Sequence, residues 1–301
     1  MSTQNRLVAV TGVTGAVGGA VARRLADAGL PQRLLARTPS RAPELPGATV
    51  HQVSYGDRAA SVAALTGVST LLMVSAAEDE HRRAQHIAFV DAAAEAGVRH
   101  VVYTSFQGAA PDATFTLARD HHATEERIRG SGMAWTFLRD AFYIDFVSQL
   151  VGEDGVIRGP AGDGRVAAVT RADVAEVAAT ALRDPEAHAG AAYELTGPEA
   201  LTMGEIAATV AAAQGRPVTY RDETLEEARA SRAVWQAPEW QLDAWISTYT
   251  AMAAGEMEHV SGDVERVLGR RPTSLAEFLA AEGRGESGSG VSWSARTAST
   301  R

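Results

Sequence analysis

Three glycines spaced three residues apart, Gly12, Gly15 and Gly18, follow a short apolar run near the start of the chain. Residues 6–10 are short and β-branched enough for a buried parallel strand, and residues 16–28 repeat apolar side chains at helical spacing. The glycines therefore lie at a predicted strand-to-helix turn, where N–H groups can bind a pyrophosphate. Gly12 permits the turn, Gly15 allows close approach of the phosphates, and Gly18 lets the helix pack on the strand. The pattern predicts a dinucleotide-binding loop, and its alternative is a glycine turn without a ligand.

A basic residue follows the second predicted strand, at the position that distinguishes NADH from NADPH in dinucleotide-binding folds. Arg37 follows the predicted strand 32–36, Arg41 is close behind, and the nearest carboxylate is Glu44. An acidic residue at this place holds the ribose 2′-hydroxyl of NADH, whereas an arginine accommodates the 2′-phosphate of NADPH. A guanidinium can also grip a phosphate with two hydrogen bonds. The position favours NADPH, and its alternative is a solvated surface arginine.

Two residue types are missing, and their absence excludes several chemistries. The chain has no cysteine, and its 28 basic residues are all arginine. Disulfides, thiolate catalysis, cysteine-bound metals, Schiff bases and a Tyr-x-x-x-Lys pair are therefore excluded. The acidic residues 78–80, followed by His81, Arg82 and Arg83, are interpreted as the start of a solvated helix. No metal site is expected.

Composition limits the classes of binding partner and the cell compartment that we expect. The net charge of −9 argues against a nucleic-acid surface, and 46% hydrophobic residues suffice for a large core. No stretch reaches the roughly 18 apolar residues of a membrane span, and residues 1–6 lack an apolar signal core. We expect a cytoplasmic protein with no nucleic-acid or membrane partner.

Alternating strands and helices must position these residues. The alternation predicts an α/β fold with a Rossmann-type, doubly wound parallel sheet. Ligands of such sheets bind beyond the carboxyl ends of the strands. The further predicted strands are 49–53, 70–74, 100–104 and 135–138, and the helices between them are 59–65, 80–96 and 117–130.

The alternation weakens beyond about residue 145. Residues 1–145 are predicted to form the NADP-binding domain, with its sheet completed by later strands, and 146–282 a smaller C-terminal α/β substrate lobe. The pattern Thr170-Arg171-Ala172-Asp173 predicts a helix start, and Pro238 interrupts a mainly helical stretch over 225–257. The glycine- and serine-rich residues 283–301 are predicted to be a disordered tail.

Taken in order over about 270 residues, these and other short motifs resemble a known family, the NmrA-like branch of the atypical short-chain dehydrogenases. Within it they are most similar to the bacterial NAD(P)H:quinone oxidoreductases, relatives of triphenylmethane reductase. The motifs are Thr11-Gly12-Val13-Thr14-Gly15, Ser54-Tyr55-Gly56-Asp57, Gln85-His86, Ala96-Gly97-Val98, Tyr103-Thr104-Ser105, Leu138-Arg139, Gly162-Asp163-Gly164, Thr170-Arg171-Ala172-Asp173, Tyr193-Glu194-Leu195 and Gly269-Arg270-Arg271-Pro272-Thr273.

The resemblance implies an NADPH that stretches across the strand ends. Residues 140–145 match the family's nicotinamide and substrate-side loop. Ala76 and Ala77 replace more serine-rich residues and so remove hydroxyl donors, while Asp140 replaces the usual asparagine and can put a charge beside the nicotinamide. The cofactor positions implied are Gly12, Val13, Thr14, Gly15, Ala16, Val17, Arg37, Ser75, Ala76 and Ala77.

Two residues are candidates for catalysis. His121 matches a histidine of the quinone-reductase pattern and could polarise an oxygen or donate a proton; the alternative is a structural hydrogen bond to a neighbouring loop. Asp140 could orient the carboxamide or cap the turn. Tyr103 lies inside a predicted strand and is interpreted as a core residue.

The predicted substrate is a planar acceptor. Gln107, Phe142 and Tyr143, with Phe106, follow strands on the ligand side and could form a flat aromatic slot, although Phe142 could equally be core between the lobes. A quinone accepts hydride without an acid at the reacting oxygen, so the missing Tyr-x-x-x-Lys pair is no obstacle. The alternatives are an inactive NADP(H)-binding redox sensor and, less favoured, a sugar-nucleotide epimerase. The oligomeric state is open, with a homodimer as one candidate.

Overall fold

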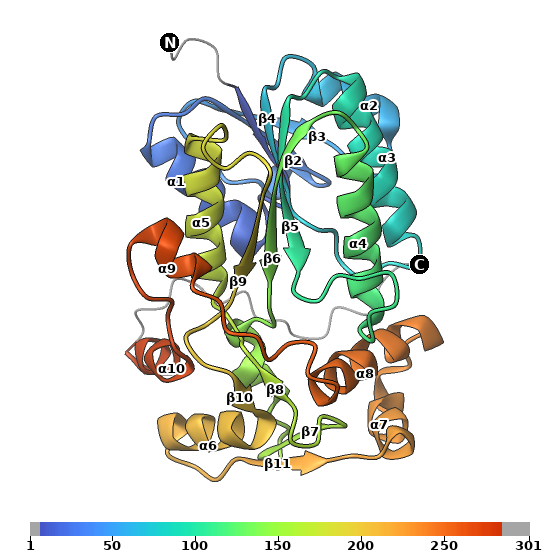
Figure 1. Ribbon diagram of the computed structural model, residues 1–301, viewed down its shortest axis with the longest axis vertical. Helices are drawn as coiled ribbons and strands as arrows, with labels where there is room; N and C mark the ends of the chain where they lie inside the picture. Colours follow the sequence, from blue (N-terminus) through green and yellow to red (C-terminus); the bar gives the residue numbers. More distant parts are fainter. Residues whose placement is uncertain (1–6, 285–301) are drawn as a thin grey trace.

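A seven-stranded parallel sheet forms the centre of the molecule (Figure 1). The computed structural model describes residues 7–284. The strand order is β3-β2-β1-β4-β5-β6-β9, and each neighbouring pair is parallel. The strands are β1 (Val8–Val10), β2 (Gln32–Ala36), β3 (Ala48–Gln52), β4 (Thr70–Met73), β5 (His100–Phe106), β6 (Ala134–Asp140) and β9 (Ala191–Leu195).

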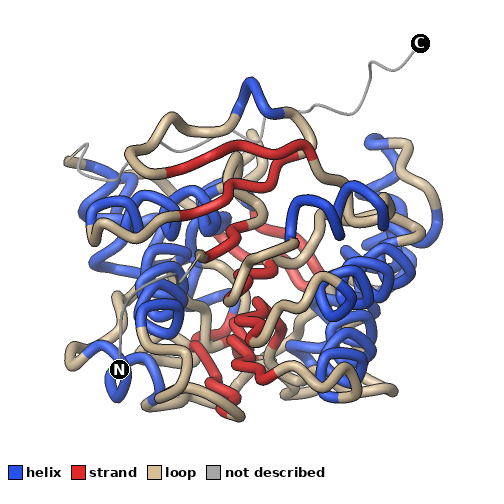
Figure 2. The backbone as a smooth tube through the Cα atoms, turned by 90° about the horizontal axis from the view of Figure 1, so that it is seen from above, coloured by secondary structure: helices blue, strands red, loops and turns tan. Residues whose placement is uncertain are grey.

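Helices cover both faces of this sheet, as Figure 2 shows from above. On one face α1 packs against α5, which in turn contacts α9, and on the other α3 lies between α2 and α4. Every residue of β1 and β4 is buried, which a parallel sheet covered on both sides requires. The helices of this part are α1 (Ala16–Asp27), α2 (Arg58–Leu65), α3 (Arg82–Glu95), α4 (Thr116–Arg129), α5 (Arg171–Arg183) and α9 (Asp263–Leu268), with the 3₁₀ turn η1 (Pro39–Arg41). The predicted doubly wound α/β fold is confirmed.

A smaller lobe lies beyond the carboxyl ends of the strands (Figure 1). It holds two two-stranded sheets, one of β7 and β11 and one of β8 and β10, around an apolar cluster of its own. Its elements are η2 (Ile144–Leu150), β7 (Val156–Gly159), β8 (Arg165–Val166), β10 (Leu201–Thr202), α6 (Met203–Gln214), β11 (Thr219–Asp222), α7 (Leu225–Arg232), η3 (Ala233–Trp235), α8 (Glu239–Ala253) and α10 (Leu275–Gly283). The break between α7 and α8 falls at Pro238, where the sequence predicts it.

The chain crosses between the two parts more than once. After η2, β7 and β8 it returns to the sheet with α5 and β9, so residues well beyond 145 complete the sheet. Gly283 ends α10 instead of starting the predicted tail, and residues 285–301 of that tail lie outside the described residues. None of the helices between residues 7 and 284 is long and apolar enough to cross a membrane.

Candidate functional site

The carboxyl ends of the parallel strands bring the predicted site residues to one edge of the sheet. Val10 pairs with Leu34 of β2 and with Leu72 of β4, so these three strands end close together. Phe106, the last residue of β5, pairs with Asp140, the last residue of β6. The segments that follow the strands therefore form one continuous edge that faces the smaller lobe, which is where open α/β sheets bind ligands.

The glycine turn opens α1 at this edge. Gly12 has φ +65°, a left-handed conformation that favours glycine. A Cβ on Gly18 would lie 2.4 Å from the backbone oxygen of Thr11, so only glycine allows the helix to pack this closely on the turn. Gly15 caps α1 without a side-chain hydrogen bond, and the first turn holds no acidic residue. The first N–H groups of α1 therefore have no capping side chain and are available to an anion, which fits a pyrophosphate.

Arg37 lies exposed directly after β2, next to this turn. None of the ion pairs or side-chain hydrogen bonds found in residues 7–284 involves its guanidinium, although its backbone oxygen accepts from Gln52. A free guanidinium here fits the 2′-phosphate of an adenosine ribose. The strand ends and the glycine turn thus fit the phosphates of NADPH.

The segment Ser75–Ala77 leaves β4 between these groups and β5. Its approach is fixed through Thr11, whose Oγ1 accepts from the Val74 N–H at 2.8 Å, and through Tyr55, whose hydroxyl donates to the Val74 oxygen at 2.6 Å. The hydroxyl of Thr104 accepts from the Ser75 N–H at 2.8 Å. Ser75 and Ala76 are half-buried and Ala77 is exposed, so this segment presents its surface to the edge.

His121 is a buried side chain. It lies in the middle of α4, is 5% exposed, and contacts Arg82 through Nε2 and the Tyr103 hydroxyl through Nδ1, both at 3.0 Å. Burial, followed by the charge of Arg82, holds the pKa of His121 well below its usual range. The imidazole is therefore neutral, with both nitrogens engaged inside the protein.

Residues 78–83 differ from the predicted start of a solvated helix in two ways: the helix begins later, and Arg82 is buried. The helix α3 begins at Arg82, so the acidic residues precede it. Arg82 is 3% exposed, because its side chain turns inward to Ala76, Asp120 and His121. Glu78, outside the helix, accepts hydrogen bonds from Gln241 and Trp245 of α8.

Asp140 is a buried carboxyl at the end of β6. It is 5% exposed and accepts a 2.6 Å hydrogen bond from the Tyr143 hydroxyl. Burial raises the pKa of Asp140 to about 8, although the Tyr143 hydrogen bond and the charge of Arg171 act in the opposite direction. At pH 7 a carboxyl with this pKa is mainly protonated, so Asp140 carries little charge at its place at the end of β6.

The predicted substrate residues separate into two groups. The Gln107 N–H donates to the Asp140 backbone oxygen at 2.9 Å, so Gln107, Asp140 and Tyr143 lie together. The Gln107 side-chain Nε2 donates to the His259 oxygen at 2.8 Å, while its Oε1 is buried without a partner. Phe106 and Phe142 instead pack against the apolar cluster of the smaller lobe. For Phe142 this is the alternative raised above, a core position between the lobes.

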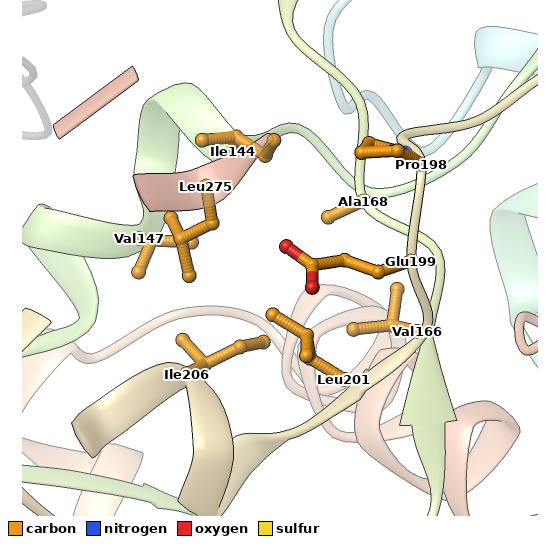
Figure 3. A pocket seen from close by; sticks show the side chains of 9 residues that line it. All are labelled: Ile144, Val147, Val166, Ala168, Pro198, Glu199, Leu201, Ile206 and Leu275. Carbon is orange, nitrogen blue, oxygen red and sulfur yellow. The ribbon is translucent and has the colours of Figure 1, made fainter. Parts of the chain in front are cut away.

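Two hollows lie within the described part of the chain, and Ile144, in the predicted loop 140–145, lines the first of them. The residues singled out for catalysis, cofactor or acceptor line neither hollow. Figure 3 shows the first, in which the carboxylate of Glu199 points into a ring of apolar side chains. Its volume of about 10 Å³ is of the order of one water molecule. The second, of about 250 Å³, is open and lies among α4, α7 and α8. Their lining residues are Ile144, Val147, Val166, Ala168, Pro198, Glu199, Leu201, Ile206 and Leu275 for the first, and Thr116, Leu225, Asp243, Ile246, Ser247 and Thr250 for the second.

The described part of the chain contains no group of three or more His, Asp or Glu side chains that could hold a metal ion. The groups that the candidate site offers are backbone N–H groups, Arg37, a neutral carboxyl and an amide.

Sequence reasoning did not single out Arg82, Thr104 or Tyr55 as site residues. Tyr55 and Thr104 stand in the motifs that carry the family resemblance, which is the signal that could have found them. Arg82 had no such signal, because its contacts come from residues 38 and 39 positions along the chain.

Comparisons with known proteins identify the family and the fold. The model of the NmrA-like family matches residues 4–279. The NAD(P)H azoreductase of Xenophilus azovorans is 35% identical over 281 residues, which cover 91% of this chain and 97% of the relative.

Two solved structures show the same fold. The NADPH-dependent quinone oxidoreductase 2 of Escherichia coli, complexed with NADPH, is 33% identical with a TM-score of 0.83, over 91% of this chain and 99% of that one. The triphenylmethane reductase of Citrobacter sp., complexed with NADP(H), is 31% identical with a TM-score of 0.80, over 92% and 99%.

Proposed function

The chain belongs to the NmrA-like family and is an NAD(P)H-dependent oxidoreductase of that family, and we propose that it reduces quinones or similar planar acceptors with NADPH by direct hydride transfer. The relatives named above are a quinone oxidoreductase, an azoreductase and a triphenylmethane reductase, and the substrates that these names give are all conjugated acceptors. We infer that this chain likewise reduces a conjugated acceptor.

The choice of NADPH rests on two groups at neighbouring strand ends that have no side-chain partner among the described residues: the first N–H groups of α1 and the guanidinium of Arg37. The uncapped start of α1 would hold the pyrophosphate, and the unpaired guanidinium of Arg37 would hold the 2′-phosphate. Ser75–Ala77 would lie along the half of the cofactor beyond the pyrophosphate, because β4 follows β1 in the sheet. When bound, NADPH supplies the hydride from its nicotinamide ring.

The acceptor choice follows from the absence of the Tyr-x-x-x-Lys acid system. There is no lysine, and the hydroxyl of the fully buried Tyr103 contacts His121 in the core. Reduction of a ketone to an alcohol needs a proton at the reacting oxygen, whereas hydride transfer to a quinone gives a hydroquinone anion whose charge is delocalised into the aromatic ring and which water can protonate. Positioning the acceptor then supplies most of the catalysis.

Asp140 and Gln107 are the polar groups that we assign to the acceptor side. The protonated Asp140 carboxyl can donate a hydrogen bond to an oxygen of the acceptor or of the carboxamide, and the Tyr143 hydroxyl holds it in place. Gln107 offers an unpartnered Oε1 beside it. We assign His121 to positioning and not to proton donation, because both of its nitrogens are engaged in the core.

The test is an NADPH oxidation screen with purified protein, using a benzoquinone, a naphthoquinone, an azo dye and a triphenylmethane dye. We expect NADPH consumption with at least one quinone, and a lower rate with NADH at equal concentration. Tight NADPH binding without turnover on any acceptor would contradict the reductase and favour a redox sensor.

A further inference from the structure

The segment that follows β4 is held by side chains from several directions. Thr11, Tyr55 and Thr104 hold Val74 and Ser75, as described above. In addition, both backbone groups of Ala76 form hydrogen bonds with side chains of α3. The Ala76 N–H donates to His86 Nε2 at 2.9 Å, and the Ala76 oxygen accepts from Arg82 Nε at 2.9 Å. Side chains from different parts of the fold thus fix three consecutive residues that have no regular secondary structure.

Arg82 links this segment to α4. One terminal nitrogen of its guanidinium donates to Asp120 Oδ2 at 3.3 Å, and the other donates to His121 Nε2 at 3.0 Å. With Nε on Ala76, all three nitrogens of a 3% exposed guanidinium are therefore engaged. The planar fork makes these bonds in three directions at once, and it keeps its charge when buried, which a lysine does not.

The hydrogen bonds determine the protonation of both histidines. His86 accepts at Nε2 from Ala76, so its proton is on Nδ1, where it donates to Thr124 Oγ1 at 3.0 Å. His121 accepts at Nε2 from Arg82, so its proton is on Nδ1, facing the Tyr103 hydroxyl. Each neutral ring thus has one accepting and one donating nitrogen in use, and the cluster has a single consistent arrangement.

We propose that Arg82, oriented by His121 and supported by His86, is a positioning residue that pre-orders Ser75–Ala77 for the nicotinamide half of the cofactor. The proposal rests on the proposed function for the identity of the ligand. Since the strand order places the end of β4 on the far side of β1 from β2, this segment lies away from the half that Arg37 would hold. A segment that is already ordered loses less conformational entropy when it binds.

The experiment compares two ligands on an Arg82→Met variant. Dissociation constants are measured for NADPH and for 2′,5′-ADP, which carries the 2′-phosphate but no nicotinamide. We expect Arg82→Met to weaken NADPH binding by about tenfold or more, the effect of a lost charged hydrogen bond, and to leave 2′,5′-ADP binding within about twofold. Arg83→Met is the matched control, because the neighbouring Arg83 is exposed; both affinities should be unchanged.

Hydrogen exchange of the ligand-free protein provides a readout that does not depend on the cofactor. Backbone amides of residues 74–77 should exchange faster in Arg82→Met than in the wild type and in Arg83→Met. If the wild type failed to bind NADPH, the proposed function would fall while this exchange result still decided whether Arg82 orders the segment. Equal losses for both ligands, or no change in either, would overturn the proposal.

A milder variant covers the case in which Arg82→Met does not fold. Thr104→Val is nearly isosteric and removes only the acceptor of the Ser75 N–H. It should weaken NADPH binding by a few-fold and leave 2′,5′-ADP binding unchanged. Unchanged NADPH affinity in this folded variant would contradict the proposed need for a pre-ordered segment.

Discussion

The chemistry that we propose depends on individual side chains at the strand ends. Among them, the Arg37 side chain has no hydrogen bond within the described residues that its removal would break. Its guanidinium makes no ion pair in residues 7–284, so its removal should disturb the fold little. Removing it tests the cofactor choice directly.

Arg37→Ala should weaken NADPH binding by about 1.5–3 kcal/mol, the contribution of a hydrogen bond to a charged group, and should affect NADH little. Dissociation constants for both cofactors check this, with wild-type protein in parallel. Equal losses for NADPH and NADH would remove the assignment of Arg37 to the 2′-phosphate.

Asp140 shows how burial changes the role of a residue. A carboxyl with its pKa raised to about 8 can donate a hydrogen bond through its O–H at neutral pH, while its other oxygen accepts one. Above that pH it is ionised and can no longer donate. Because the folded state holds the proton more tightly than the unfolded chain, the contribution of this proton to stability is fully present below the ordinary carboxyl pKa of 3.8 and is lost progressively as pH rises from there through about 8.

With quinone as the acceptor, kcat/KM should therefore fall as pH rises through about 8, the pKa of Asp140. In Asp140→Asn, whose amide donates at every pH, this fall should disappear. Circular dichroism at each pH ensures that the loss is not unfolding. A fall that persists unchanged in Asp140→Asn would assign the titration to another group.

At the scale of elements, the contact between α1 and the turn before it depends on Gly18. A Cβ there would lie 2.4 Å from the Thr11 oxygen and 2.5 Å from the Gly12 carbonyl carbon, both backbone atoms that cannot rotate away. The helix could accept a side chain only by moving off the turn, which would also displace the N–H groups offered to the pyrophosphate.

Gly18→Ala should therefore destabilise the protein by about 1–3 kcal/mol, the cost of overpacking, and weaken NADPH binding further. Gly204→Ala is the control, because its nearest neighbour, Thr202 Oγ1, is 3.8 Å away; it should leave stability equal or raise it by up to about 1 kcal/mol. Urea unfolding of both variants makes the comparison. Similar midpoints for the two would refute the close-packing argument.

At the scale of the whole molecule, the smaller lobe is joined to the site by hydrogen bonds that cross the edge of the sheet. Gln107 donates to the His259 oxygen, and Thr114 donates through N–H and hydroxyl to the Glu256 carboxylate. Glu78, which follows the Ser75–Ala77 segment, accepts from Trp245 and Gln241 of α8. The lobe therefore contacts both the proposed cofactor segment and the proposed acceptor residues, so its placement determines which acceptor fits.

Much of this architecture follows from local sequence. The predicted strand 32–36 is β2 residue for residue, the helix predicted to follow Thr170 is α5, and Pro238 separates α7 from α8 where expected. Hydrophobic periodicity, caps and glycines act over a few neighbouring residues, so a single sequence determines them. The glycine turn and the position of Arg37 after β2 belong to the same class.

The effects of these elements on one another arise from contacts that exist only in the folded chain. The burial of Arg82, the neutral state of His121 and the raised pKa of Asp140 depend on neighbours from other elements. A residue pattern predicts which face of a helix is apolar, but it does not predict which charge packs beside which carboxyl, because desolvation and pairing arise after the chain has folded. Local sequence accounts for the sheet, the glycine turn and the absence of a lysine acid system. The folded structure decided which polar groups stay charged, and which of them face the site.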